Sequence, residues 1–83
     1  MVYLILEVRA LDEVVKLPGV AIWAGSNVLT ELNHKELVAK GVNVTRFNHP
    51  VSGAIRSELE DAIETIKEHH PTESIWVQYA SQP

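Results

Sequence analysis

The residues best placed to do chemistry are five carboxylates that lie close together between positions 58 and 68. If this segment is helical, a rotation of about 100° per residue puts four of them on one face. Like charges one helical turn apart repel each other, so the cluster gains no stability from its own charges. A hard cation reverses this effect, because Ca²⁺ takes carboxylate oxygens as ligands. The pattern therefore predicts a weak Ca²⁺ site formed by Glu58, Glu60, Asp61, Glu64 and Glu68.

The same carboxylates also fit a solvated helix surface, because a stripe of apolar residues lies on the opposite side of the helix. That stripe consists of Ile55, Leu59, Ala62, Ile63 and Ile66. The sequence contains no EF-hand loop, so a second segment would have to complete the shell of oxygens around the ion. Asp12, Glu13 and Glu73 are the candidates for that contribution.

Histidine and serine give weaker indications of chemistry. His69 and His70 end the acidic helix, where a protonated imidazole interacts favourably with the helix dipole. His34 and His49 are isolated from other histidines, so the sequence holds no zinc pair with helical spacing. A remote alternative is a small hydrolase that uses Ser26 and His49, but Ser26 lacks the second glycine of a G-x-S-x-G turn. We therefore expect no catalytic residues and no enzyme.

Two segments, residues 24–27 and 51–54, contain glycine and precede expected helices. A helix N-terminus can hold an anion, but neither segment completes a P-loop or a dinucleotide fingerprint. Helix capping explains both segments. Core packing explains Trp23 and Trp76 better than a base-stacking platform does, because no basic groove accompanies them.

The composition limits the partners that the chain can bind. Eleven acidic and seven basic residues give a net charge of −4, and the basic residues are scattered singly. Nucleic acids and anionic membranes require clustered positive charge, so we expect neither as a partner. The absence of cysteine excludes disulfides, zinc-thiolate sites and iron–sulfur clusters. The apolar run at the start ends at Glu7 and is too short for a membrane span, so we expect one cytoplasmic domain over residues 1–83.

Hydrophobic periodicity predicts the elements that must position these residues. It predicts four strands, over residues 2–8, 20–24, 42–47 and 74–79. It also predicts helices over residues 13–17, within 25–40 and over 53–70. The middle segment is ambiguous, because it forms either one long helix or a strand over 28–32 followed by a short helix from His34; we favour the long helix.

Simple alternation of strands and helices would give a doubly wound parallel sheet. Two of the strands carry polar positions, however, which favours a sheet with helices mainly on one face. We therefore predict an α+β domain in which a four-stranded mixed sheet and about three helices form two layers.

Three segments carry a resemblance to a known family: the opening MVYLILEV, the segment VAIWAGSN and the acidic helix RSELEDAIETIKEHH. Together with the length and the acidic, cysteine-free composition, they resemble a small archaeal family of uncharacterised biochemical role. One member of that family is known as a calcium-binding α+β domain. The resemblance covers nearly the whole chain and implies an α+β fold with weak Ca²⁺ binding by surface carboxylates. It assigns no ligand positions, so the choice of the helix cluster rests on geometry.

A second function stays open beside calcium binding. The chain could instead be a metal-free module for protein interaction or self-association, covered by a second subunit over a sheet face that carries aromatic side chains. The candidates for that face are Tyr3, Trp23, Phe47 and Trp76. We accordingly expect a monomer or a weak homo-oligomer.

Overall fold

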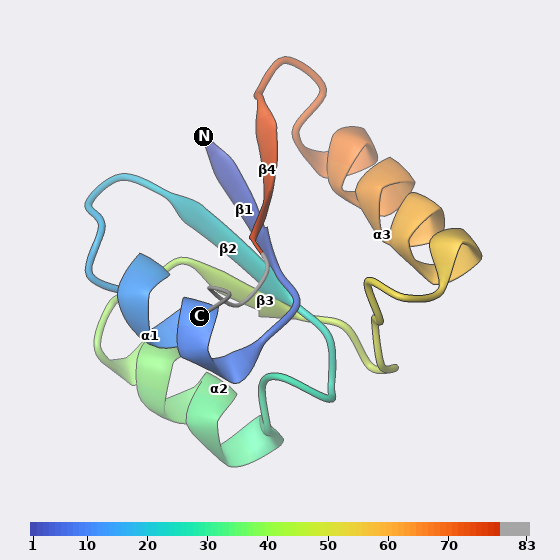
Figure 1. Ribbon diagram of the computed structural model, residues 1–83. Coiled ribbons are helices and arrows are strands. Elements are labelled where there is room, and N and C mark those ends of the chain that lie inside the picture. The colour runs from blue at the N-terminus through green and yellow to red at the C-terminus, as the bar shows by residue number, and fades with distance from the viewer. Residues whose placement is uncertain (79–83) are drawn as a thin grey trace.

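The computed structural model describes residues 1–78. Strands and helices alternate along the chain (Figure 1): β1 (Val2–Ile5), α1 (Val8–Val14), β2 (Ala21–Ala24), α2 (Glu31–Ala39), β3 (Val44–Arg46), α3 (Arg56–His69) and β4 (Ile75–Gln78). This content confirms the predicted combination of three helices with a four-stranded sheet. The last predicted strand extends to Tyr79, which lies outside the described residues.

All four strands are parallel, in the order β3-β2-β1-β4. The predicted mixed sheet is therefore wrong. The two central strands are almost wholly buried, as strands of a parallel sheet covered on both faces usually are. The polar positions that suggested a solvated face belong to β3 and β4, which are the two edges of the sheet. A strand at the edge of a sheet is partly exposed, and it therefore carries the same alternation of apolar and polar residues as a strand whose sheet has one face open to water.

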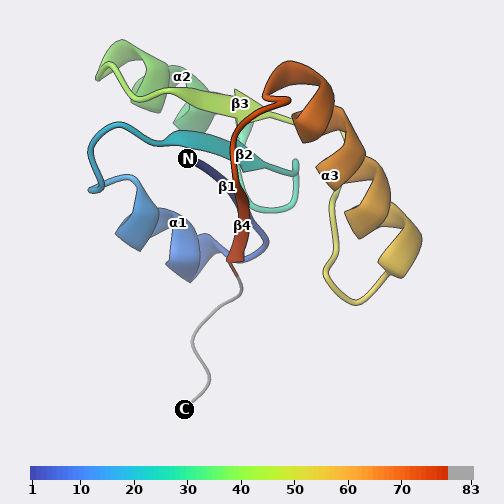
Figure 2. The same cartoon turned by 90° about the horizontal axis from the view of Figure 1, so that it is seen from above.

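Helices cover both faces of the sheet, with α1 and α2 on one face and α3 on the other (Figure 2). The structure thus has three layers rather than the predicted two. The core on the α3 side includes Val2, Leu4, Trp23, Phe47, Val51, Ala62 and Ile66. The core on the α1–α2 side includes Ile5, Leu11, Val14, Ile22, Val28, Leu29 and Val44.

The first helix starts earlier than predicted. The chain leaves β1 after Ile5, and Glu7 is the N-cap of α1, so the predicted strand over 2–8 and helix over 13–17 both have wrong bounds. Ala10, Leu11 and Val14 are the buried residues of α1, and they have helical spacing. The apolar run of the strand leads directly into the apolar stripe of the helix, which hides the boundary between them in the sequence.

The ambiguous segment forms neither one long helix nor a strand over 28–32. A turn follows β2, and α2 begins at Glu31 with Thr30 as its N-cap, whose Oγ1 accepts a hydrogen bond of 3.1 Å from the Asn33 N–H. Thr30 is therefore the cap of this helix, whereas residues 24–27 were expected to provide the capping. Gly41 follows the helix with φ of 84°, a left-handed conformation that glycine adopts without strain and that is typical of the residue after a helix.

The longest helix begins at Arg56 and not at Gly53. Ser52, within the segment 51–54 that was expected to cap this helix, instead closes a tight turn, because its Oγ accepts a hydrogen bond of 3.2 Å from the Ala54 N–H. The helix ends at His69, shortly before Pro71, as the proline predicts. No helix within residues 1–78 is both long and apolar enough to cross a membrane.

Candidate functional site

The five predicted calcium ligands lie on α3 but do not converge. Glu60 accepts a hydrogen bond of 2.9 Å from Arg56 Nε, and Glu58 accepts one of 3.1 Å from the Ser52 N–H, so these two carboxylates point toward different partners. Asp61, Glu64 and Glu68 are exposed. Within residues 1–78, no group of three or more acidic or histidine side chains is placed to hold a metal ion.

The acidic residues expected to complete the calcium site either lie away from α3 or already bind other groups of the protein. Asp12 and Glu13 belong to α1, which lies on the opposite face of the sheet. Glu73 has both carboxylate oxygens in use, one with the Met1 ammonium and one with His70. Calcium binding by the α3 cluster therefore stays a prediction without a second segment to complete its ligand shell.

The remote hydrolase pair is close in space but lacks the geometry of a dyad. The Ser26 N–H donates to the His49 carbonyl at 3.0 Å, which is a backbone contact. The His49 ring donates from Nδ1 to the Pro50 carbonyl and lies 5.4 Å from the Phe47 ring. Among the described residues, the Ser26 hydroxyl has no hydrogen bond to a histidine that could act as its base.

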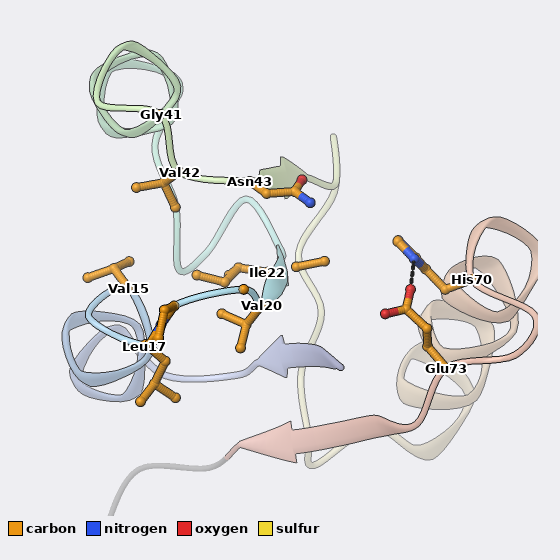
Figure 3. Close-up of a pocket in the computed structure, with 12 residues that line it drawn as sticks. Val15, Leu17, Val20, Ile22, Gly41, Val42, Asn43, His70 and Glu73 are labelled. Carbon is orange, nitrogen blue, oxygen red and sulfur yellow. Dashed lines mark hydrogen bonds and ion pairs between the residues drawn. The ribbon is translucent and has the colours of Figure 1, made fainter.

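Two hollows lie at opposite ends of the parallel strands. The amino-edge hollow lies where β2 and β3 begin and has a volume of about 450 Å³. Apolar side chains, among them Val15, Leu17 and Val42, line one side of it (Figure 3). His70 and Glu73, from the connection between α3 and β4, lie on the other side.

The His70 and Glu73 side chains in the amino-edge hollow are bonded to groups of the protein itself. The Met1 ammonium lies 2.8 Å from Glu73 Oε1, and His70 Nδ1 bonds to Glu73 Oε2. The hydrogen bond from the terminal ammonium, followed by the one from His70, lowers the pKa of the Glu73 carboxyl, whereas desolvation acts in the opposite direction. The Trp23 ring packs beside His70 at 6.1 Å. This network ties the start of β1 to the start of β4, which is a structural role.

The carboxyl-edge hollow lies where β1 and β2 end and has a volume of about 240 Å³. It is lined by the residues that follow β1, by the turn after β2 and by the turn before α3: Leu6, Glu7, Val8, Asn27, Val28, Ser52, Gly53 and Ala54. The connections after β1 and β2 lead to helices on one face of the sheet, whereas the connection after β3 leads to α3 on the other face. Connections that diverge in this way leave a crevice at the carboxyl ends of the strands, which is the usual ligand position in open parallel sheets.

Two of the turns around the carboxyl-edge hollow are joined to each other. Asn27 Nδ2 donates to the Val51 carbonyl at 3.3 Å, and the Val51 N–H donates to Asn27 Oδ1 at 3.1 Å. Gly25 lies beneath this pair, where an added Cβ would come within 2.5 Å of Asn27 Oδ1 and 2.6 Å of the Val51 nitrogen. Only glycine at position 25 leaves room for the hydrogen bonds between Asn27 and Val51. Gly25 therefore allows these bonds to hold the two turns together.

Among residues 1–78, Glu7 is the one charged residue that lines the carboxyl-edge hollow. It is the N-cap of α1, yet its side chain makes no capping hydrogen bond, and it is exposed. Leu6 and Val28 are each 5% exposed and provide apolar walls beside it. The hollow thus combines a carboxylate that has no partner among the described residues with apolar surface and with the Ser52 hydroxyl.

Sequence reasoning missed this arrangement because its parts are distant along the chain. Residues 24–27 and 51–54 were each explained by helix capping, and nothing in their spacing shows that Asn27 bonds to Val51. Glu7 was assigned to a strand. A charged residue directly after a fully apolar strand is the indication that could have marked it, because such positions lie at the carboxyl edge of a parallel sheet.

Comparison of the chain with protein-family models, with curated proteins and with solved structures gives no match. A doubly wound sheet hosts many unrelated functions, so the function has to be inferred from the groups that the fold brings together.

Proposed function

We propose that the domain binds a small organic amine in the carboxyl-edge hollow. The observation that carries the proposal is the Glu7 carboxylate, which lines the hollow without a side-chain hydrogen bond to any described residue. A protonated amine would form a charge-assisted hydrogen bond with it, and such bonds are stronger than those between neutral groups.

The walls of the hollow suit the rest of such a ligand. Val8 is 54% exposed and offers apolar surface to a short hydrocarbon body, and the nearly buried Leu6 and Val28 lie beside it. The Ser52 hydroxyl already accepts a bond from Ala54, and its own proton remains free to meet an acceptor on the ligand. The volume of about 240 Å³ suits a small metabolite or a single side chain.

A phosphate-bearing ligand fits the same hollow poorly. No lysine or arginine is among the described residues that line it, and Glu7 would repel an anion. Glu58 adds a second carboxylate directly behind the turn, where it binds the Ser52 N–H. The electrostatic character of the hollow therefore favours a cation over a nucleotide.

Three probes of nearly equal shape test the charge preference: benzylamine, benzyl alcohol and benzoate. We expect benzylamine to bind most tightly, benzyl alcohol more weakly and benzoate least, as measured by calorimetric titration at high protein concentration. Equal dissociation constants for the three probes, or tighter binding of benzoate, would contradict the proposal.

The variant Glu7→Gln tests the residue directly. A charge-assisted hydrogen bond exceeds a neutral one by about 1 kcal/mol, so we expect benzylamine to bind roughly fivefold to tenfold more weakly and to lose most of its advantage over benzyl alcohol. Glu13→Gln is the matched control, because Glu13 is an exposed residue of the same helix that does not line the hollow. If both variants weakened binding equally, the general charge of the surface and not Glu7 would be responsible.

A further inference from the structure

We propose that two copies of the chain form a homodimer by joining their β4 strands edge to edge across a twofold axis. β4 ends the sheet beside β1, and no other described strand lies beyond it (Figure 2). An edge strand presents backbone N–H and C=O groups that a strand from another chain can bind.

The hydrogen bonds to β1 show which groups of β4 are free. The Val2 N–H donates to the Ser74 carbonyl at 3.0 Å, and the Leu6 N–H donates to the Gln78 carbonyl at 3.1 Å. Backbone groups of successive strand residues point to alternate sides, so residues 74, 76 and 78 face β1. Ile75 and Val77 therefore turn their N–H and C=O groups toward the open edge.

This spacing is self-complementary in an antiparallel pair. A twofold axis at Trp76 would pair Ile75 with the partner's Val77 and Val77 with the partner's Ile75, and each such pair exchanges both of its hydrogen bonds. Trp76 would then face its own copy at a position without hydrogen bonds, where the Cα atoms approach to about 4.5 Å and side chains are closest.

Trp76 is the side chain that such pairing would cover. It is 53% exposed, and its register partner Tyr3 places it on the face of the sheet that α1 and α2 cover over the other strands. Tryptophan is enriched in protein interfaces because it buries a large area at a small cost in side-chain entropy. An exposed tryptophan in the centre of a free strand edge matches that use.

The charges around β4 permit two copies to approach. No residue of β4 is charged, and the adjacent Glu73 is paired with the Met1 ammonium. The other edge of the sheet differs, because β3 has only three residues and carries Arg46, which bonds to the Leu29 carbonyl. Short length and charge are the usual means by which an edge strand avoids pairing, and β4 has no charge.

The dimer should be weak. A half-exposed tryptophan contributes on the order of 100 Å² per copy, whereas a stable interface buries about 800 Å² per partner. We therefore expect sedimentation equilibrium to show the 9.3 kDa monomer at low micromolar concentration and a mass approaching twice that value near millimolar concentration.

Two variants test the residue that anchors the interface. Trp76→Lys would place like charges opposite each other, so we expect it to remain monomeric over the whole range. Leu32→Lys is the matched control, because Leu32 is 67% exposed on α2, far from β4 in the fold, and should dimerise as the wild type does. A wild type that is monomeric at millimolar concentration, or a folded Trp76→Lys variant that still dimerises, would overturn the proposal.

Hydrogen exchange on the wild type tests the geometry without any substitution. We expect the Ile75 and Val77 amides to exchange fast at low concentration and to become protected as the dimer forms. The Trp76 and Gln78 amides face β1 and should be protected at both concentrations. Dimerisation that leaves the exchange of Ile75 and Val77 unchanged would show that another surface forms the interface.

Discussion

The two ends of the parallel sheet differ in what their polar groups do. At the amino edge, the larger hollow is lined by His70 and Glu73, and Glu73 has both oxygens occupied by partners from the protein itself. At the carboxyl edge, the smaller hollow contains Glu7, whose carboxylate has no such partner among the described residues, beside turns fixed by Asn27.

This difference shows why volume alone is a poor guide to a site. A group that is already satisfied by its own chain gains little from a ligand, whereas a free group held by a rigid frame binds without a cost of reorganisation. The amino edge uses its charges to hold the structure together. The carboxyl edge uses backbone and amide hydrogen bonds for that purpose and leaves its charge available.

The largest expected difference between the two edges concerns their glycines. Gly25→Ala forces a methyl group into backbone and side-chain atoms at the carboxyl edge, so we expect a loss of about 2–3 kcal/mol in the free energy of unfolding. Gly19→Ala is the control at the amino edge, where nothing lies within 4 Å of the added Cβ but φ is +69°. We expect it to cost about 1 kcal/mol through backbone strain alone. Urea unfolding measures both values. An equal loss of unfolding free energy in the two variants would show that the carboxyl edge is not packed more closely than the amino edge.

Two asparagines provide the next comparison. Asn27→Ala removes both hydrogen bonds to Val51 and should lower the free energy of unfolding by about 1–2 kcal/mol. Asn43 lines the amino-edge hollow with an exposed side chain, so Asn43→Ala should change the value by less than about 0.5 kcal/mol. Thermal unfolding followed by circular dichroism distinguishes the two outcomes. If Asn27→Ala is as stable as the wild type, the two turns are held by other contacts.

The stability that Glu73 provides at the amino edge should depend on pH. Because the pKa of Glu73 is lowered from its ordinary value of 4.5 in the folded protein, its stabilising effect is full above that value and is lost as the pH falls through the folded pKa. Wild type should therefore unfold at a higher temperature than Glu73→Gln near pH 7, and the gap should narrow as the pH falls below 4.5.

Glu7→Gln is the control for this pH dependence, because Glu7 has no side-chain capping bond to lose. Its unfolding temperature should differ little from that of the wild type at either pH. A gap for Glu73→Gln that stays constant from neutral to acidic pH would contradict the structural role assigned to Glu73.

The smallest effect is expected on the α3 surface, which belongs to neither edge. The calcium hypothesis predicts shifts of amide resonances confined to residues 58–68, and separate carboxylates bind Ca²⁺ only at millimolar or higher concentration. Glu64→Gln should weaken these shifts. Changes that are uniform and equal to those caused by NaCl would dismiss calcium binding by this cluster.

Local patterns in the sequence predicted the number and approximate position of the elements. Apolar runs marked the strands, and Pro71 and Gly41 marked helix ends, because these features act on their own segments. The parallel direction of all four strands was not predicted. The polar positions of β3 and β4 suggested a sheet with one face open to water, whereas these strands are exposed because they are the edges of the sheet. Edge position depends on the order of strands in space, which periodicity does not contain.

The candidate site was missed for a similar reason. The bonds between Asn27 and Val51 connect two turns that are separated by 24 residues in sequence. Glu7 is recognisable as a candidate binding residue only when those two turns lie beside it in the folded chain. The acidic residues of α3 were visible in the sequence because they share one helix, and their shared face says nothing about ligands from other elements.

The position of bound benzylamine tests the comparison of the two edges most directly, by mapping amide chemical-shift changes over residues 1–78 at saturation. We expect the largest changes at residues 6–8, 27–28 and 52–54, around Glu7. Changes centred on residues 15–22, 41–43 and 70–73 would place the ligand at the amino edge and contradict the assignment of the site.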